Sequence, residues 1–187
     1  MTPQSAEATK TIKSVEKQTV LKMEHVTKRF GGLVAVSDFN LDLKEGELIG
    51  LIGPNGAGKT TIFNLITHVI PITEGKMEFY GKDIANLTTD RIIRLGVART
   101  FQNIRLFSNM TVRENILTAF HAHLKSGLFT AVAFLPKYKN EEEYFQQKTL
   151  ELMKEVGIEH LADNISSSLP YGLQRKLEIA RALATNP

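Results

Sequence analysis

The feature that most limits what this chain can fold into is a glycine-rich segment between a short apolar run and a stretch with helical spacing. Its residues are Gly53, Pro54, Asn55, Gly56, Ala57, Gly58, Lys59, Thr60 and Thr61. They contain the pattern Gly-x-x-x-x-Gly-Lys-Thr, which matches the Walker A phosphate-binding loop. Glycines let backbone N–H groups turn inward, and a helix that begins after the loop directs its N–H groups and positive dipole end at an anion.

This loop predicts a site for ATP and Mg²⁺. Lys59 supplies a cation for the β- and γ-phosphates, and Thr60 supplies a hydroxyl for Mg²⁺. The flanking pattern agrees with that prediction. Residues 47–52 are typical of a strand buried on both faces of a parallel sheet. Residues 60–70 show the helical spacing of an amphipathic helix, which we expect Pro71 to end.

The rest of the chain predicts an α/β fold. Residues 1–19 are polar, carry no signal-peptide core and are typical of a flexible tail. We expect a small antiparallel sheet from residues 20–23, 33–36 and 39–43. Strand, helix and strand at 76–80, 88–95 and 97–101 predict a parallel sheet. Helices are expected at 112–124, 141–156 and 173–184, with an apolar stretch at 127–136 between the first two.

Composition narrows the class of protein. Hydrophobic residues make up 42% and charged residues 23%, the net charge is +3, and there is no cysteine. These values are typical of a soluble globular domain without a disulfide framework or thiolate metal site. The longest nearly apolar run, 127–135, is far shorter than the roughly 20 residues that span a bilayer. We therefore expect no direct membrane insertion, and the lack of basic–aromatic interleaving speaks against a nucleic-acid partner.

Four segments carry a resemblance to one family. Residues 50–61 look like the Walker A stretch of ABC ATPases, and residues 29–33 resemble their aromatic loop. Gln102, within residues 99–103, matches the glutamine of their Q-loop, and residues 169–174 resemble their signature sequence. The resemblance implies a P-loop NTPase (ABC ATPase) core with an N-terminal antiparallel β subdomain and a helical subdomain.

The same resemblance implies roles for individual residues. Phe30 would stack on adenine, although its ring also suits a core position. Gln102 would ligate Mg²⁺ or orient water. Tyr171 and Gly172 would contact the γ-phosphate held by an opposite subunit, although Tyr171 equally suits packing. Pro170 and Leu173 stand where the commonest signature has serine and glutamine, which removes side-chain hydrogen bonds.

Finer features are similar to the LivG type of branched-chain amino-acid importer ATPase. They lie at 101–107, 110–115, 127–129 and 177–183, and the resemblance runs from about residue 20 to residue 187. It implies an ATP-binding subunit on the cytoplasmic face of the inner (plasma) membrane, with transmembrane permease subunits and a second ATPase subunit as partners. Arg105, Phe107 and Met110 are candidates for permease docking or for subdomain core. Cassettes for urea, other amino acids or lipopolysaccharide look alike.

Within that family the resemblance divides residues 20–187 into three parts. They are the β subdomain and P-loop core at 20–110, the helical subdomain at 111–170 and the signature helix at 171–187. The family's next element is an apolar strand ending in Asp-Glu, the Walker B pair, and no apolar run of this sequence ends that way. We therefore expect a chain truncated before Walker B, without the C-terminal part of the core and without the glutamate that acts as general base.

Such a chain would bind nucleotide weakly and hydrolyse it poorly. Two alternatives remain open at this point. One is a nucleotide-binding fragment without hydrolysis, and the other is a soluble ABC ATPase that acts on nucleic acid or ribosomes.

Overall fold

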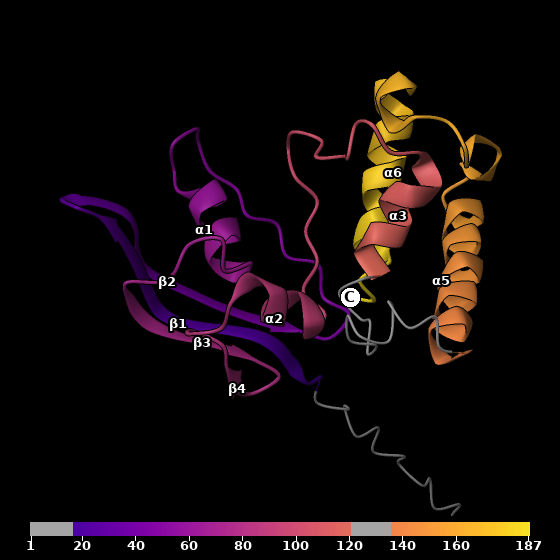
Figure 1. Cartoon of the computed structure of the whole chain (residues 1–187). Helices are drawn as coiled ribbons and strands as arrows, with labels where there is room; N and C mark the ends of the chain where they lie inside the picture. Colours follow the sequence, from indigo (N-terminus) through magenta and orange to yellow (C-terminus); the bar gives the residue numbers. More distant parts are fainter. Residues whose placement is uncertain (1–16, 121–135) are drawn as a thin grey trace, which may run out of the picture. The chain divides into compact units, whose positions relative to one another are not determined.

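A computed structural model describes residues 17–120 and 136–187, and side chains from residue 142 onward in the second range (Figure 1). The described chain divides into two compact units. The first holds the residues up to Lys59 together with Ile72–Ala85, and the second holds Thr60–Pro71 and Asn86–Pro187.

The first unit is built on a four-stranded antiparallel sheet of order β2-β1-β3-β4. Its strands are β1 (Thr19–Phe30), β2 (Leu33–Lys44), β3 (Glu74–Phe79) and β4 (Lys82–Asp83). Alternation along β1 buries Leu21 and Met23, and Met23 lies opposite the buried Met77 of β3. Because successive side chains of a strand point to opposite faces, this period of two creates one apolar face.

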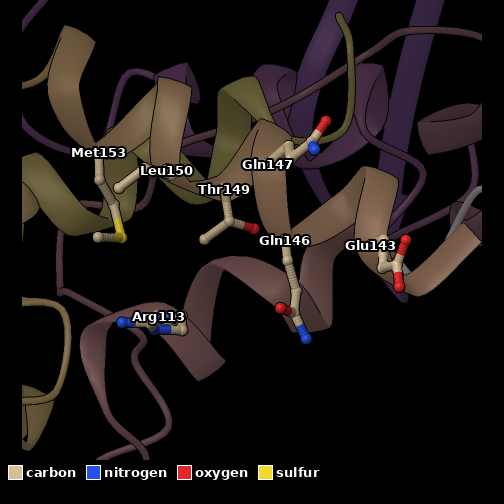
Figure 2. A pocket seen from close by; sticks show the side chains of 7 residues that line it. All are labelled: Arg113, Glu143, Gln146, Gln147, Thr149, Leu150 and Met153. Atoms are coloured by element: carbon tan, nitrogen blue, oxygen red, sulfur yellow. The ribbon is translucent and has the colours of Figure 1, made fainter. Parts of the chain in front are cut away.

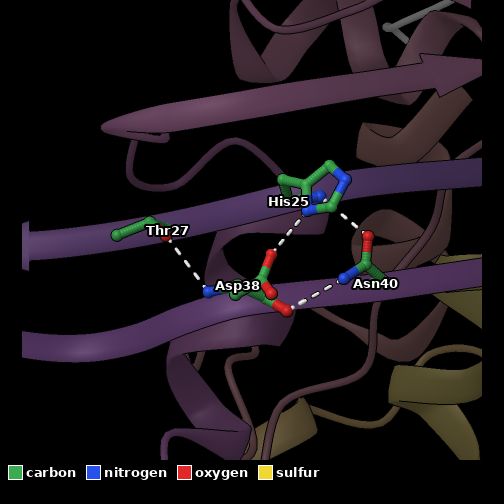
Figure 3. Close-up of polar contacts among 4 residues, drawn as sticks. All are labelled: His25, Thr27, Asp38 and Asn40. Atoms are coloured by element: carbon green, nitrogen blue, oxygen red, sulfur yellow. Dashed lines mark hydrogen bonds and ion pairs between the residues drawn. The ribbon is translucent and has the colours of Figure 1, made fainter.

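A cluster of polar contacts bends β1 and β2 where their pairing shifts register (Figure 3). His25 and Asp38 both have a φ of 51°, a region in which Asp, Asn and His are the commonest non-glycine residues. The His25 Nδ1 lies 2.6 Å from the Asp38 Oδ1. The Asp38 N–H donates to the Thr27 Oγ1 at 3.1 Å, and the His25 N–H donates to the Asn40 Oδ1 at 2.8 Å. These bonds satisfy groups that the bulged ladder leaves unpaired.

The second unit is helical. It contains most of α1 (Lys59–Ile66), α2 (Thr89–Arg94), α3 (Val112–Phe120), α5 (Pro136–Glu155) and α6 (Tyr171–Leu183), with short 3₁₀ turns at Glu159–Leu161 and Ser166–Ser168. Helices α3, α5 and α6 pack side by side (Figure 1). Their shared core includes the fully buried Ile116, Met153, Ile158, Leu177 and Ala180.

The start of α3 is held by side chains. Thr111 and Glu114 form a capping box, in which the Thr111 N–H donates to the Glu114 carboxylate at 2.8 Å and the Glu114 N–H donates to the Thr111 Oγ1 at 3.2 Å. These hydrogen bonds lower the pKa of the Glu114 carboxyl, the larger contribution coming from the Thr111 backbone N–H. The box fixes the point at which the loop from residues 101–110 becomes helix.

Several expected elements agree with the structure in kind but not in extent. The two hairpin strands are longer than the three short segments expected at 20–43. The helix expected at 60–70 ends at Ile66, before Pro71 acts on it. The helices expected at 141–156 and 173–184 begin earlier, at Pro136 and Tyr171. The expectations for residues 121–135 lie outside the described residues.

Two expected strands are wrong. Residues 47–52 and 97–101 form no strand, and the described residues contain no parallel pairing. Leu48 and Ile52 are 99% and 93% exposed, not buried. A central strand needs a hydrogen-bonded neighbour on each side, and no described segment pairs with either of these. The apolar pattern of residues 47–52 therefore indicates side chains that favour burial. It does not show whether a neighbouring strand is present to bury them.

None of the helices in the described ranges has the length and apolarity needed to cross a membrane.

Candidate nucleotide-binding site

The glycine-rich loop joins the end of the exposed segment 47–52 to α1. Gly56 and Gly58 have φ values of +85° and +80°, which L-residues with a side chain rarely adopt. Gly58 also lies against β2. A Cβ placed on it would stand 2.6 Å from the carbonyl oxygen of Ala35 and 3.4 Å from the Val36 Cγ2. Glycine at this position is therefore required both by backbone conformation and by space.

The ammonium group of Lys59 folds back over this loop. Its Nζ donates to the carbonyl oxygens of Gly53 and Pro54, each at 2.6 Å. The Ala57 N–H donates to the Pro54 carbonyl at 3.2 Å, which closes the loop on itself. Since an ammonium has three N–H bonds, one remains for an anion in addition to these two. The loop residues Gly53–Ala57 are exposed, so an anion can reach them.

The donor set fits a nucleotide phosphate and its metal ion. An ammonium, free loop N–H groups and the first turn of α1 are the chemistry that phosphate requires. Thr60 follows Lys59 in that first turn and is exposed, so its hydroxyl is available to Mg²⁺, whereas Thr61 is partly buried. A Cβ on Gly56 would meet no atom within 4 Å, so the space beside Gly56 is open.

Phe30 ends β1 and is 48% exposed, with the Lys28 Nζ 5.0 Å from its ring centroid. The exposed position of this ring therefore disagrees with the alternative that Phe30 is a core residue. A half-exposed aromatic face next to a cation is able to accept a flat ring from solvent.

Gln102 lies in the second unit, on an exposed loop. The neighbouring residue, Phe101, contacts α6 through its backbone and two arginines through its ring. Its N–H donates to the Glu178 Oε1 of α6 at 2.9 Å, and its carbonyl accepts from the Arg175 guanidinium. The guanidinium carbons of Arg99 and Arg105 lie 4.9 and 4.8 Å from its ring centroid.

The first turn of α6 presents Tyr171 and Gly172 to solvent. Tyr171 is 67% exposed, which disagrees with the packing alternative for its ring. Pro170 precedes the helix and caps it without a side-chain hydrogen bond. The Gln174 side chain donates instead to the Leu169 carbonyl at 2.8 Å. The helix therefore begins with accessible N–H groups of the kind that suit an anion.

The three residues expected to dock a permease are surface residues. Arg105 is exposed, and Phe107 and Met110 are partly exposed. The Arg181 guanidinium carbon lies 5.0 Å from the Phe107 ring centroid, and Arg181 donates to the Arg105 carbonyl. Burial lowers the pKa of the Arg181 guanidinium. These contacts place the loop against α6 without burying it.

The sequence patterns did not predict two buried polar residues that position loops of the second unit, Glu178 and Asn115. Glu178 is a buried carboxylate in the apolar stripe of α6, next to Leu177, and Arg175 precedes it by three residues. A charge within an apolar stripe, with an opposite charge one turn away, was the signal available in the sequence. The buried Asn115, which ties the loop at 107–111 to α3, gave no such signal.

A cavity of about 310 Å³ lies between α3 and α5 (Figure 2). Its lining residues are Arg113, Glu143, Gln146, Gln147, Thr149, Leu150 and Met153. None of these is among the expected site residues. The Arg113 guanidinium is paired with Asp163 at 3.2 Å.

A phosphate loop with these donors, an antiparallel sheet and a helical unit together define an ATP-binding cassette. The chain belongs to the ABC transporter family, whose model matches residues 36–187. The expected family and the expected α/β class are thereby confirmed.

More particularly, the chain is similar to the high-affinity branched-chain amino acid transport ATP-binding protein LivG of Salmonella typhimurium. It is 41% identical over 170 residues, which cover 91% of this chain and 67% of LivG. Two solved structures resemble it. One is the ADP conformation of MJ1267, an ATP-binding cassette of an ABC transporter, with TM-score 0.74, 31% identity and coverage of 90% and 66%. The other is the dimeric post-hydrolysis state of the cassette MJ0796 bound to ADP and Pi, with TM-score 0.70, 27% identity and coverage of 89% and 70%. The chain thus spans about two thirds of the length of these proteins.

Proposed function

We propose that this chain is the nucleotide-binding part of an ABC importer subunit that couples ATP binding and hydrolysis to the uptake of branched-chain amino acids. The observation that carries the proposal is the Lys59 ammonium held at 2.6 Å over the carbonyls of Gly53 and Pro54, at the start of α1. The substrate rests on the 41% identity to LivG, whose name states that role.

In this proposal the loop residues Gly53–Thr61 hold the phosphates. Lys59 exchanges its contacts with loop carbonyls for the β- and γ-phosphate oxygens, and the loop N–H groups bind the remaining oxygens. Thr60 and Gln102 ligate Mg²⁺, which neutralises charge on the phosphates when bound. Phe30 stacks on adenine through its exposed face.

A second ATPase subunit would complete the site. Tyr171 and Gly172, at the accessible start of α6, would contact the γ-phosphate on the opposite subunit, as an anion at a helix N-terminus. The solved dimer of MJ0796 supports this arrangement by likeness. Residues 111–170 would act as the helical subdomain, and residues 171–187 as the signature helix. Arg105, Phe107 and Met110 would dock the permease on the cytoplasmic face of the inner membrane, with no insertion of this chain and no nucleic-acid partner.

Hydrolysis is proposed for the subunit and not for these 187 residues alone. No apolar run of the sequence ends in Asp-Glu, the pair in which the family resemblance places the general base. By itself the chain should bind nucleotide and turn it over slowly. A non-hydrolysing nucleotide binder is the alternative function, and an importer of urea, other amino acids or lipopolysaccharide is the alternative for substrate.

The first test is binding of a fluorescent ATP analogue to the purified chain. We expect saturable binding that Lys59→Ala weakens by at least about 10-fold, because a charge-assisted hydrogen bond to phosphate is lost. Lys82→Ala, an exposed lysine on β4, serves as the matched control and should bind like the wild type. Absence of saturable binding, or equal binding by Lys59→Ala, would refute the proposal.

A second test addresses substrate and hydrolysis. A cell lacking this gene, supplied with the whole gene, should regain uptake of radiolabelled leucine, isoleucine and valine, and the Lys59→Ala gene should not restore it. Regained uptake of urea alone would show that the transported substrate is urea and not a branched-chain amino acid. Binding without hydrolysis by the assembled transporter would establish the non-hydrolysing binder.

A further inference from the structure

Phe101, the residue before Gln102, is fixed by hydrogen bonds to both its backbone N–H and its backbone carbonyl. Its N–H donates to the Glu178 Oε1 at 2.9 Å, and its carbonyl oxygen accepts from the Arg175 Nη1. Both partners lie on α6, within the same compact unit as the loop. A backbone held at both its donor and its acceptor has little freedom left in the neighbouring torsions.

The carboxylate that makes this contact is buried. Glu178 is 5% exposed, and its second oxygen accepts from the Arg175 Nη1 at 2.6 Å. Leu177 and Ala180, on the same helix, are fully buried. A buried carboxylate carries a large desolvation cost, so an apolar residue would serve this packing position better. An apolar residue, however, could neither accept a hydrogen bond from the Phe101 N–H nor hold Arg175 against the Phe101 carbonyl.

The ring of Phe101 is held as well. The guanidinium carbons of Arg99 and Arg105 lie 4.9 and 4.8 Å from its centroid. Arg99 also donates to the Asn64 Oδ1 of α1 at 2.7 Å and to the Thr67 Oγ1 at 3.2 Å. Burial lowers the pKa of the Arg99 guanidinium, with a further lowering from Arg105. Phe101 is thus bonded to α6 through its backbone and to the α1 region through Arg99.

Gln102 stands next to this anchored residue and is exposed. Among the described residues its side chain makes no hydrogen bond, which leaves it available to a ligand. The anchor and the free side chain are adjacent in the chain, so the anchor sets where the side chain can reach.

We propose that Glu178 and Arg175 are positioning residues for Gln102: they clamp the Phe101 peptide to α6 and thereby fix the point from which Gln102 meets Mg²⁺ and water. The inference rests on the proposed function for the role of Gln102, but the clamp itself is a separate claim. Because α6 also begins with Tyr171 and Gly172, the clamp joins the loop of Gln102 and the signature turn into one body.

Two glutamate variants separate positioning from packing. Glu178→Gln keeps an oxygen acceptor for the Phe101 N–H and nearly the same volume, whereas Glu178→Ala removes the acceptor and the partner of Arg175. Glu155→Ala, at an exposed position of α5, is the matched control. The direct readout is amide hydrogen exchange of the Phe101 N–H in the whole chain without nucleotide.

We expect exchange at Phe101 to rise by about 10-fold or more in Glu178→Ala and by less than about 3-fold in Glu178→Gln, with the core amides of α3 unchanged. Unchanged exchange at Phe101 in Glu178→Ala would overturn the clamp. A rise of equal size across α3 and α6 would also overturn it, since Glu178 would then act only on stability.

The second readout is ATP hydrolysis by the assembled transporter as a function of Mg²⁺ concentration. Glu178→Ala should raise the Mg²⁺ concentration for half-maximal rate by about 5-fold and leave Mg²⁺-free ATP binding within about 2-fold. Equal Mg²⁺ dependence in the variant and the wild type would overturn the link to Gln102. Absence of hydrolysis in the wild type would instead refute the proposed function, and the exchange result would still decide the clamp.

Discussion

Gly58 of the phosphate loop lies so close to Ala35 of β2 that a Cβ on the glycine would stand 2.6 Å from the alanine carbonyl oxygen. The antiparallel sheet therefore touches the nucleotide loop directly through its backbone. Because that carbonyl belongs to a strand paired with β1, it cannot move away without disturbing the ladder.

Gly58→Ala should distort the loop and weaken ATP binding by at least about 10-fold, since a non-glycine residue at positive φ and the contact with Ala35 cost about 1–3 kcal/mol. Gly50→Ala is the control, because a Cβ on Gly50 meets no atom within 4 Å. Titration with a fluorescent ATP analogue measures both. Wild-type ATP affinity in Gly58→Ala would show that the contact between Gly58 and Ala35 does not constrain the loop.

Phe30→Ala should weaken ATP binding by about 5-fold or more, because stacking of a base on an aromatic ring contributes about 1–3 kcal/mol. Binding of inorganic tripolyphosphate, which has no base, should stay unchanged in the same variant. Leu33→Ala, on the other side of the same turn and also exposed, is the control. Parallel loss of ATP and tripolyphosphate binding would show that Phe30 supports the fold and not the base.

Thr27→Val should destabilise the first unit by about 1–2 kcal/mol, since the Asp38 N–H loses its acceptor at 3.1 Å. Thr27→Ser keeps the hydroxyl and should recover most of that stability. Urea unfolding followed by circular dichroism gives the comparison. If the valine and serine variants were equally stable, the register shift between β1 and β2 would not depend on this bond.

Asn115→Ala should destabilise the helical unit by about 2–4 kcal/mol. The Asn115 amide accepts from the Phe107 N–H at 2.9 Å and donates to the carbonyls of Phe107, Met110 and Thr111, all around a fully buried side chain. Asn103→Ala, at an exposed position, is the control. Urea unfolding again provides the measurement, and a loss below about 1 kcal/mol would contradict the role of the network.

Stability should fall in acid partly through His68. Burial lowers the pKa of this imidazole, and a hydrogen bond to the Leu87 carbonyl only partly opposes the shift. Its Nδ1 lies 3.1 Å from that carbonyl, so Nδ1 carries the proton, and the buried Nε2 has no hydrogen-bond partner among the described residues. The native state therefore favours neutral histidine, while the unfolded chain takes up a proton near the ordinary pKa of about 6.5.

Because the unfolded state then binds more protons, the contribution of neutral His68 to stability is complete above pH of about 6.5 and is lost as the pH falls below it. His68→Gln should reduce the fall in unfolding free energy across this range. Urea unfolding at a series of pH values checks the slope. An identical slope in the variant would mean that His68 does not titrate differently in the two states.

Expectations from the sequence were most accurate for local features. Spacing of apolar residues located α2, α3 and α6, because a helix closes its hydrogen bonds within a few residues. The hairpin of β1 and β2 agrees with the antiparallel sheet expected from residues 20–43, although its strands are longer than the expected segments. Residues 47–52 were predicted wrongly as a strand, since their apolar pattern does not reveal whether a neighbouring strand is there to pair with them.

The amino-acid sequence alone predicts the chemistry of the loop, because glycines, Lys59 and Thr60 in this order before a helix form the pattern of a phosphate site. The folded chain alone reveals that Ala35 lies against Gly58 and that Glu178 binds Phe101, a pair 77 residues apart in the sequence. The physical reason is that a loop motif is encoded by consecutive torsions and side chains. A contact across such a distance depends instead on how whole strands and helices pack, which no local pattern specifies.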